Sequence, residues 1–268
     1  MWRSFFRDGW GDVALLAAPS LLKVLPPRDV ERALVLLTKN ARDEERKKEA
    51  LAQRRAALAR AQLAILLDPA RFREALAAEK AGALSGLQLP PREIGARLLR
   101  LYFHQIYGPH ATLLELRSAV FAQKDGDLCW SGGSLFVEWD PAFLGALREL
   151  YAGYYGSDSA RFRRALSPLG LASVEAELWQ YFGHARTASV TFDLAELRRT
   201  FVGLLTRCRE TGAHLHPDFV PLGIYLGCLY EHLATCGGAH DAAAAWRDVQ
   251  HQASRTDELE RAAQSAAL

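Results

Sequence analysis

The stretch 119-AVFAQKDGDLCW-130 interrupts a sequence whose apolar residues otherwise recur mostly at helical spacing. Two short apolar runs, Ala119–Ala122 and Leu128–Trp130, flank the dipeptide Asp125-Gly126. Asp-Gly tolerates the positive φ angles of a two-residue turn between antiparallel strands. The stretch therefore predicts a β-hairpin, which we expect to be the only sheet. Residues 135–137 predict a third short strand or a turn.

Helices are predicted on both sides of this hairpin. The stretch 42–67 has no Gly or Pro and is rich in strong helix formers, so it predicts one long helix. After the hairpin, Asp140-Pro141 predicts a helix start, because Asp accepts hydrogen bonds from the first amides and Pro fits the first turn. The predicted fold class is mainly α, a helical bundle with one small hairpin. The other predicted helices cover 29–39, 72–80, 94–106, 142–154, 159–166, 173–182, 194–211 and 218–234.

Length and composition limit the function classes. The 268 residues are 50% hydrophobic and 24% charged, as in globular proteins, and the net charge of +2 does not favour nucleic acid. The longest apolar run, Val13–Leu25, is too short to span a bilayer and is interrupted by Pro19 and Lys23. Asp8 and Asp12 precede it, which does not fit a signal peptide. We expect a cytoplasmic protein.

Three regions are predicted along the chain. Residues 1–69 form an N-terminal helical region, residues 70–238 the main helical domain, and residues 239–268 a polar, Ala-rich tail anchored by Trp246 and Val249. The four cysteines contain no close pair, so we expect reduced, mostly buried thiols. They are Cys129, Cys208, Cys228 and Cys236.

Four segments carry a likeness to a known family. They are Ile94–Ile106 with its Arg-Leu-Leu-Arg, the turn Asp125–Leu128, the helix start Asp140–Phe143, and Leu215–Gly223 with its Pro-Asp-Phe. Their order and spacing resemble the C-terminal lobe of the UbiB/AarF-type atypical kinases, over about Leu84–Leu233. The resemblance implies a protein-kinase-like C-lobe, here without its N-lobe, because residues 1–83 carry none of the N-lobe motifs.

The family's metal ligands are missing from the positions where the resemblance places them. In the family, a His-Ala-Asp-Pro-His-Pro-Gly-Asn loop precedes the hairpin and Asp-Phe-Gly follows it. The first loop falls here on 110–120, where Glu115 is the only carboxylate, and the metal-binding Asp falls on Gly132. Phosphoryl transfer needs oxygen ligands that hold magnesium against the phosphates. We therefore expect no cofactor and no kinase activity.

The leading hypothesis is a catalytically inactive scaffold or regulatory subunit that binds a protein partner or a second copy of itself. The resemblance further implies a place near isoprenoid or quinone metabolism, peripheral to the membrane, with an isoprenoid lipid as a possible ligand. One alternative is an enzyme whose rebuilt cleft uses His110, Glu115, Asp125 and Asp127 for acid–base chemistry. Another is a carrier of a hydrophobic ligand with an apolar tunnel.

Two further features carry alternative interpretations. His214 and His216 form a His-x-His that can present two imidazoles to one zinc, or they flank an ordinary helix start. Cys228 and Cys236, with His232 between them, are either ligands or core residues, and the apolar neighbours favour the core.

Two segments are candidates for an interaction surface, with a lipid surface or a partner protein as the ligand. Both also have plainer interpretations, as a packing helix and as a solvated helix face. The aromatic N-terminus contributes Trp2, Phe5, Phe6 and Trp10, and the basic helix contributes Arg46, Lys47, Arg54 and Arg55.

Overall fold

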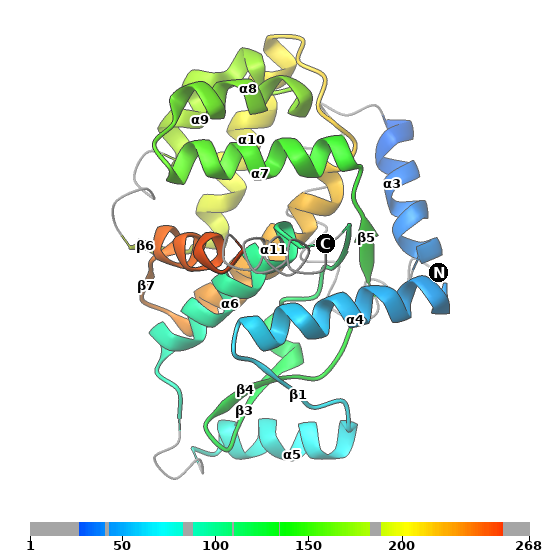
Figure 1. Cartoon of the computed structure of the whole chain (residues 1–268), viewed down its shortest axis with the longest axis vertical. Helices are drawn as coiled ribbons and strands as arrows, with labels where there is room; N and C mark the ends of the chain where they lie inside the picture. The colour runs from blue at the N-terminus through cyan, green and yellow to red at the C-terminus, as the bar shows by residue number, and fades with distance from the viewer. Residues whose placement is uncertain are drawn as a thin grey trace, which may run out of the picture.

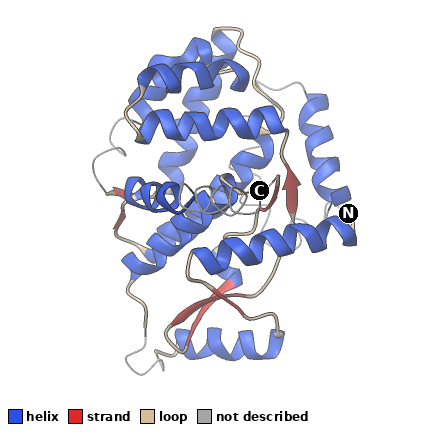
Figure 2. Cartoon of the chain, viewed as in Figure 1, coloured by secondary structure: helices blue, strands red, loops and turns tan. Residues whose placement is uncertain are grey.

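The computed structural model describes residues 27–40, 43–82, 88–108, 110–133, 135–182 and 189–253 (Figure 1). Most of the described chain is helical, and the strands are short (Figure 2), so the predicted mainly α fold class is confirmed. The α-helices are α3 Pro27–Asn40, α4 Glu44–Arg60, α5 Pro69–Lys80, α6 Pro91–Ile106, α7 Pro141–Tyr155, α8 Ser159–Leu169, α9 Glu175–Phe182, α10 Leu194–Glu210 and α11 Phe219–Cys236, with a further helix over 242–253. The 3-10 helices are η1 Ser118–Val120 and η2 Ala172–Val174, and the strands are β1 Ala64–Ile65, β2 Ala111–Leu113, β3 Phe121–Lys124, β4 Asp127–Trp130, β5 Phe136–Glu138, β6 Val190–Thr191 and β7 Ala239–His240.

The predicted hairpin is confirmed, but the expectation that it forms the only sheet is wrong. Strands β3 and β4 pair antiparallel around Asp125 and Gly126, whose φ angles of 52° and 84° are those of a tight hairpin turn. Strand β1 adds to β4 in parallel, and β6 pairs with β7. Strand β5, expected as a strand or a turn, pairs with β2 instead of joining the hairpin.

The single long helix predicted over 42–67 is also wrong. Helix α4 ends at Arg60, and Gln62 adopts a positive φ of 60° that turns the chain. The next residues leave the helical path, and Ala64–Ile65 pairs with Cys129–Trp130 of β4. Backbone pairing with a strand far along the chain thus outweighs the helix propensity of these residues, which is a weak preference of well under 1 kcal/mol per residue.

Helices α7 and α10 begin at an aspartate that caps the first turn. The Asp140 carboxylate accepts hydrogen bonds from the amides of Ala142 and Phe143 at 2.9 and 3.0 Å, as expected for the start of α7. Asp193 accepts from the amide of Glu196 at 2.7 Å at the start of α10. These carboxylates satisfy amides that have no partner within the helix.

Most of the core is one apolar cluster that extends from Leu37 of α3 to Val249 of the last helix, and a small separate cluster of Phe72, Ala75 and Ala122 joins α5 to β3. Helices α6 and α11 cross in the middle of the molecule, α7–α10 cover one end, and the hairpin with α5 lies at the other end (Figure 1). Trp246 and Val249, predicted to anchor the tail, are buried. Among the described helices, none has the length and apolar character needed to cross a bilayer.

Helices α7 and α8 approach so closely at Gly153 that a side chain there would meet the backbone of α8. A Cβ atom at Gly153 of α7 would lie 2.3 Å from the backbone nitrogen of Phe162 in α8, whereas a Cβ atom at Gly145 of α7 would meet nothing within 4 Å. The two positions share one helix and differ only in what faces them.

Substitution of these two glycines is expected to change stability in opposite directions. Gly153→Ala should lower the free energy of unfolding by about 1–3 kcal/mol, because the two backbones must move apart. Gly145→Ala should raise it by about 0.5–1 kcal/mol, because alanine favours the helix. Denaturant unfolding measures both, and equal effects of the two substitutions would contradict the close α7–α8 approach.

Candidate functional site

The buried guanidinium of Arg54 lies where α4, α6 and the segment after β2 meet. Arg54 is 1% exposed, and its Nη1 donates to the side-chain oxygen of Gln105 in α6 and, at 3.4 Å, to the carbonyl of Leu113. Its Nη2 donates to the carbonyl oxygen of Glu115 at 2.8 Å, and the guanidinium carbon lies 5.0 Å from the ring centre of Trp130. Three separate parts of the chain are thereby fixed to one side chain.

The hydrogen-bond acceptors of Arg54 are neutral oxygens, and its positive charge also lies near the face of an indole ring and within electrostatic reach of Glu115. Burial lowers the pKa of Arg54 to about 10, which still leaves the group charged at neutral pH. A cation above an aromatic ring is attracted by the negative ring face. Arg54 is therefore a buried charge held by oriented carbonyl groups and Trp130.

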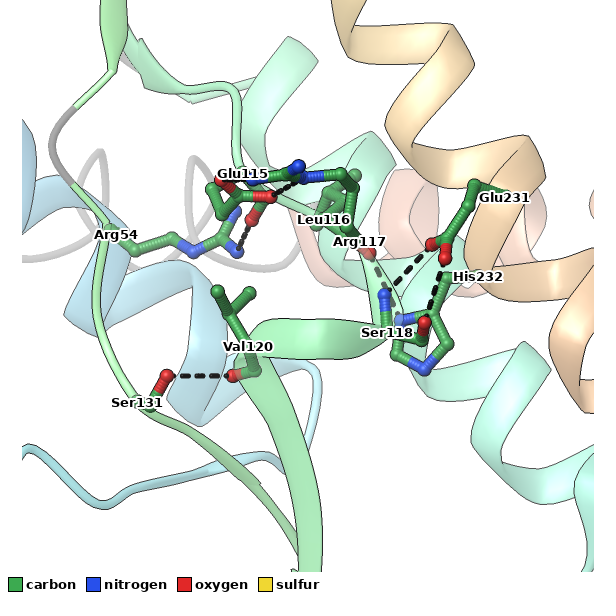
Figure 3. A network of polar contacts seen from close by, with 9 residues as sticks. All are labelled: Arg54, Glu115, Leu116, Arg117, Ser118, Val120, Ser131, Glu231 and His232. Atoms are coloured by element: carbon green, nitrogen blue, oxygen red, sulfur yellow. Dashed lines mark hydrogen bonds and ion pairs between the residues drawn. The ribbon is translucent and has the colours of Figure 1, made fainter. Parts of the chain in front are cut away.

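The only carboxylate of the segment before the hairpin is already paired. Glu115 is 4% exposed, and its two oxygens accept hydrogen bonds from the Nε and Nη2 of Arg117 at 2.7 and 2.8 Å. Figure 3 shows this pair beside the point at which Arg54 reaches the backbone of Glu115. Such a two-point arginine–carboxylate pair uses the lone pairs that a metal ion would need.

Helix α11 holds the same segment from its other side (Figure 3). Glu231 accepts hydrogen bonds from the amide and the hydroxyl of Ser118 at 2.9 and 2.8 Å. His232 contacts the carbonyl of Leu116 through Nδ1 at 3.0 Å, which makes Nδ1 the donor. Residues 115–118 are thus fixed on both sides, by arginine side chains and by α11.

The segment after the hairpin touches the segment before it. A Cβ atom at Gly133 would lie 3.0 Å from the Cβ of Glu115, and the φ of 113° at Gly132 is one that favours glycine. The two stretches in which the resemblance places the metal ligands are therefore neighbours. Where they meet, Glu115 pairs with Arg117, and Arg54 donates to the carbonyl of Glu115.

The four residues of the alternative enzyme hypothesis do not converge. Glu115 is buried, whereas His110, Asp125 and Asp127 are exposed. Asp127 lies at the turn end of the hairpin, three residues or about 10 Å along the strand from Trp130, which lies near Gly133 and Glu115. Glu115 therefore lies in the core, whereas the other three side chains face solvent.

The His-x-His segment joins the start of α11 to the start of α7. His214 is exposed, and His216 packs on Phe143 with ring centres 4.9 Å apart and accepts a hydrogen bond from the amide of Asp218 through Nδ1. Asp218, predicted near the first turn of α11, makes no capping bond and accepts from the amide of Asp140 at 2.8 Å instead. Within the described ranges, no three His, Cys, Asp or Glu side chains gather closely enough to hold a metal ion.

The cysteines agree with the prediction of mostly buried thiols. Cys129, Cys208 and Cys228 are buried, Cys236 is half-buried, and all four are free thiols. Burial raises the pKa of the Cys236 thiol to about 11, so it is protonated at neutral pH. The Nδ1 of His232, the candidate ligand between Cys228 and Cys236, instead donates to the carbonyl of Leu116.

The prediction that Arg54 lies on an exposed basic face of α4 is wrong, whereas Arg46 and Arg55 are exposed and Lys47 is half-buried. Arg46 is exposed and pairs with Glu138 at 2.9 Å, Lys47 pairs with Glu44, and Arg55 is exposed. Arg54 is buried because it lies on the helix face of Ala50, Ala57 and Leu58. That i, i+4 spacing is the sequence signal that identifies Arg54 as inward-facing. The aromatic candidates Trp2, Phe5, Phe6 and Trp10 lie outside the described residues.

The arrangement is one of fixed, mutually paired groups. Arg54 and Arg117 present positive charge to the place between the two segments, and the Glu115 carboxylate is fully engaged by Arg117. Comparison of the chain with protein-family models, with curated proteins and with solved structures gives no match.

Arg54 and Arg55 offer a matched pair of arginine substitutions on one helix. Arg54→Ala should lower the free energy of unfolding by about 3 kcal/mol or more, because it leaves the buried Gln105 side-chain oxygen and the Glu115 carbonyl without the arginine that donates to them. Arg55→Ala, at an exposed position, should change it by less than about 0.5 kcal/mol. Urea unfolding of the two variants measures the difference, and a mild effect of Arg54→Ala would refute the central role of this guanidinium.

The buried His232 makes stability depend on pH. Burial lowers the pKa of His232 to about 4, from an ordinary value of 6.5. Below pH 6.5 the unfolded chain binds a proton here that the folded chain does not, so stability is complete above 6.5 and falls until about pH 4, by about 3 kcal/mol in total. His232→Asn retains a donor for Leu116 and does not titrate. Unfolding measured between pH 7 and pH 4 should therefore show a smaller loss for the variant, and parallel pH curves would contradict the assignment.

Proposed function

We propose that this protein is a catalytically inactive scaffold or regulatory subunit, built on a lobe of the kinase type that no longer binds magnesium nucleotide. The proposal rests on the contacts found where the segments before and after the hairpin meet. There Nε and Nη2 of Arg117 donate to the carboxylate of Glu115, and Arg54 donates to the backbone carbonyl of the same residue.

Charge is the physical reason why this arrangement opposes phosphoryl transfer. The reaction needs a divalent cation, held by carboxylate and amide oxygens, that neutralises the phosphates. A magnesium ion placed beside Glu115 would have to displace Arg117 and lie close to the positive charge of Arg54. Two like charges in a buried, poorly solvated place repel strongly.

The contacts among the four family-like segments support the kinase-lobe part of the proposal. Asp140, in the segment that begins α7, donates its amide to Asp218 in the segment that begins α11. Arg97 in α6 pairs with Asp127 at the hairpin turn at 3.8 Å, and all four segments contribute side chains to the main apolar core. The segments that carry the likeness thus lie around one shared core.

The scaffold role is favoured over the rebuilt enzyme because the titratable groups of the alternative are dispersed. His110, Asp125 and Asp127 are exposed, and Glu115 is paired. A location at a membrane surface and a link to isoprenoid or quinone metabolism rest on the family resemblance alone. The partner is a protein or a second copy of this chain.

Calorimetric titration with ATP and Mg²⁺ tests the loss of catalysis. The expected result is no magnesium-dependent heat at micromolar nucleotide, because Glu115 is engaged and the neighbouring arginines repel the cation. The matched control is Glu115→Gln, which should behave like the natural chain. Micromolar, magnesium-dependent affinity that is lost in the Glu115→Gln variant would overturn the proposal.

The scaffold half of the proposal has a separate readout. Protein purified from its native source should carry a stoichiometric protein partner or a second copy of the chain. A monomer that retains no partner at native abundance would contradict the scaffold role, whatever the calorimetry shows.

A further inference from the structure

Two buried hydrogen-bond donors that belong to one contact have no acceptor among the described residues. They are the Nε of Arg54 and the indole Nε1 of Trp130, in side chains that are 1% and 0% exposed. The guanidinium carbon of Arg54 lies 5.0 Å from the centre of the Trp130 ring. Buried polar groups without a partner are rare in folded proteins, so two beside each other call for a common explanation.

The chemistry of the two nitrogens limits the missing partner to an acceptor. The Nε of an arginine and the Nε1 of a tryptophan can donate a hydrogen bond but cannot accept one. The other nitrogens of Arg54 already donate to the Gln105 side chain and to the carbonyl of Glu115. The Glu115 carboxylate does not serve the two free donors, because both of its oxygens accept from Arg117.

The charge of Arg54 favours an anion over a neutral acceptor. Every oxygen that accepts a hydrogen bond from this guanidinium is neutral. A carbonyl or a water molecule would satisfy the two free donors, but it would leave the buried charge without a directly bonded anion. Opposite charges in contact attract each other more strongly in a poorly solvated place than in water.

The surrounding backbone limits the size of that anion. A Cβ atom at Gly133 would lie 3.6 Å from the Cζ2 of Trp130, which is two bonds from Nε1, and 3.0 Å from the Cβ of Glu115. Gly132 and Gly133 are themselves half-buried, so a thin layer of backbone separates this edge of the indole ring from solvent. Contacts this close exclude a phosphate group or a nucleotide, which leaves an anion of a single atom.

We propose that the Nε of Arg54 and the Nε1 of Trp130 bind one chloride ion beneath the backbone of Gly132 and Gly133. The ion accepts one hydrogen bond from each nitrogen and pairs with the guanidinium charge. It thereby joins α4 to the end of β4 and to the segment after the hairpin. The site does not depend on the scaffold role or on the loss of nucleotide binding, since both of its donors are structural side chains.

Urea unfolding of the full-length chain, in sodium chloride and in sodium gluconate of equal ionic strength, tests the proposal. Gluconate is too large for the site, so only chloride should stabilise the folded chain through it. Above the dissociation constant, a tenfold rise in chloride should lower the ratio of unfolded to folded chain about tenfold. Trp130→Phe keeps a ring beside the guanidinium but removes one donor. It should shift this dependence to about tenfold higher chloride or beyond, because a hydrogen bond to a charged group is lost.

The matched control is Trp139→Phe. The Nε1 of Trp139 already donates to the hydroxyl of Thr112 at 2.8 Å, so this substitution also removes a buried indole but no free donor. Its chloride dependence should equal that of the natural chain. An equal chloride dependence in the natural chain and in both variants would be a general salt effect and would overturn the proposal.

Anomalous scattering from bromide gives a second readout that needs no variant to fold. Crystals of the natural chain grown with sodium bromide in place of chloride should show an anomalous peak within hydrogen-bond distance of both Arg54 Nε and Trp130 Nε1. A water molecule at that position without anomalous signal would overturn the proposal, as would bromide found only on the surface of the molecule.

Discussion

The buried positive charge of Arg54, whose hydrogen-bond partners are all neutral oxygens, constrains the centre of this molecule. The Arg54 guanidinium has to find its compensation in carbonyl oxygens, one amide oxygen and an aromatic ring, and these come from α6, from the end of β2 and from β4. A buried charge left without such partners costs several kcal/mol. The relative positions of α4, α6 and the hairpin therefore depend on one side chain.

The same constraint shapes the place where the two hairpin-flanking segments meet. Arg54 binds the carbonyl of Glu115, the Glu115 side chain pairs with Arg117, and the backbone that follows is bound through Ser118 to Glu231 of α11. Glycine at 133 lets the second segment approach within contact of Glu115. The result is a network in which Arg54 of α4 and Glu231 of α11 fix the segment 115–118 from two sides.

Local signals in the sequence were sufficient for the elements that local chemistry decides. Asp125-Gly126 predicts the hairpin and Asp140 predicts the start of α7, because a turn or a cap is a matter of a few adjacent residues. Strand β1 could not be predicted in this way. The apolar run that contains it reads as helix or strand equally well, and its partner in β4 is about 65 residues away. The candidate site divides similarly: Glu115 was identifiable as a lone carboxylate, whereas its shielding by Arg54 and α11 depends on contacts between distant segments. The charge of Arg54 predicts an exposed side chain, whereas its spacing from Ala50 and Leu58 places it on the buried face of α4.

The geometry around Arg54 has a consequence for how the sequence can drift. Lysine cannot replace this arginine, since a single ammonium group lacks the planar fork that serves Gln105 on one side and the Glu115 carbonyl on the other. Shortening Gln105 would in turn leave one arm of the fork empty. Positions 54 and 105 are therefore bound to change together, and in any set of homologous chains they should form a covarying pair whose members are exchanged jointly for apolar residues or retained jointly.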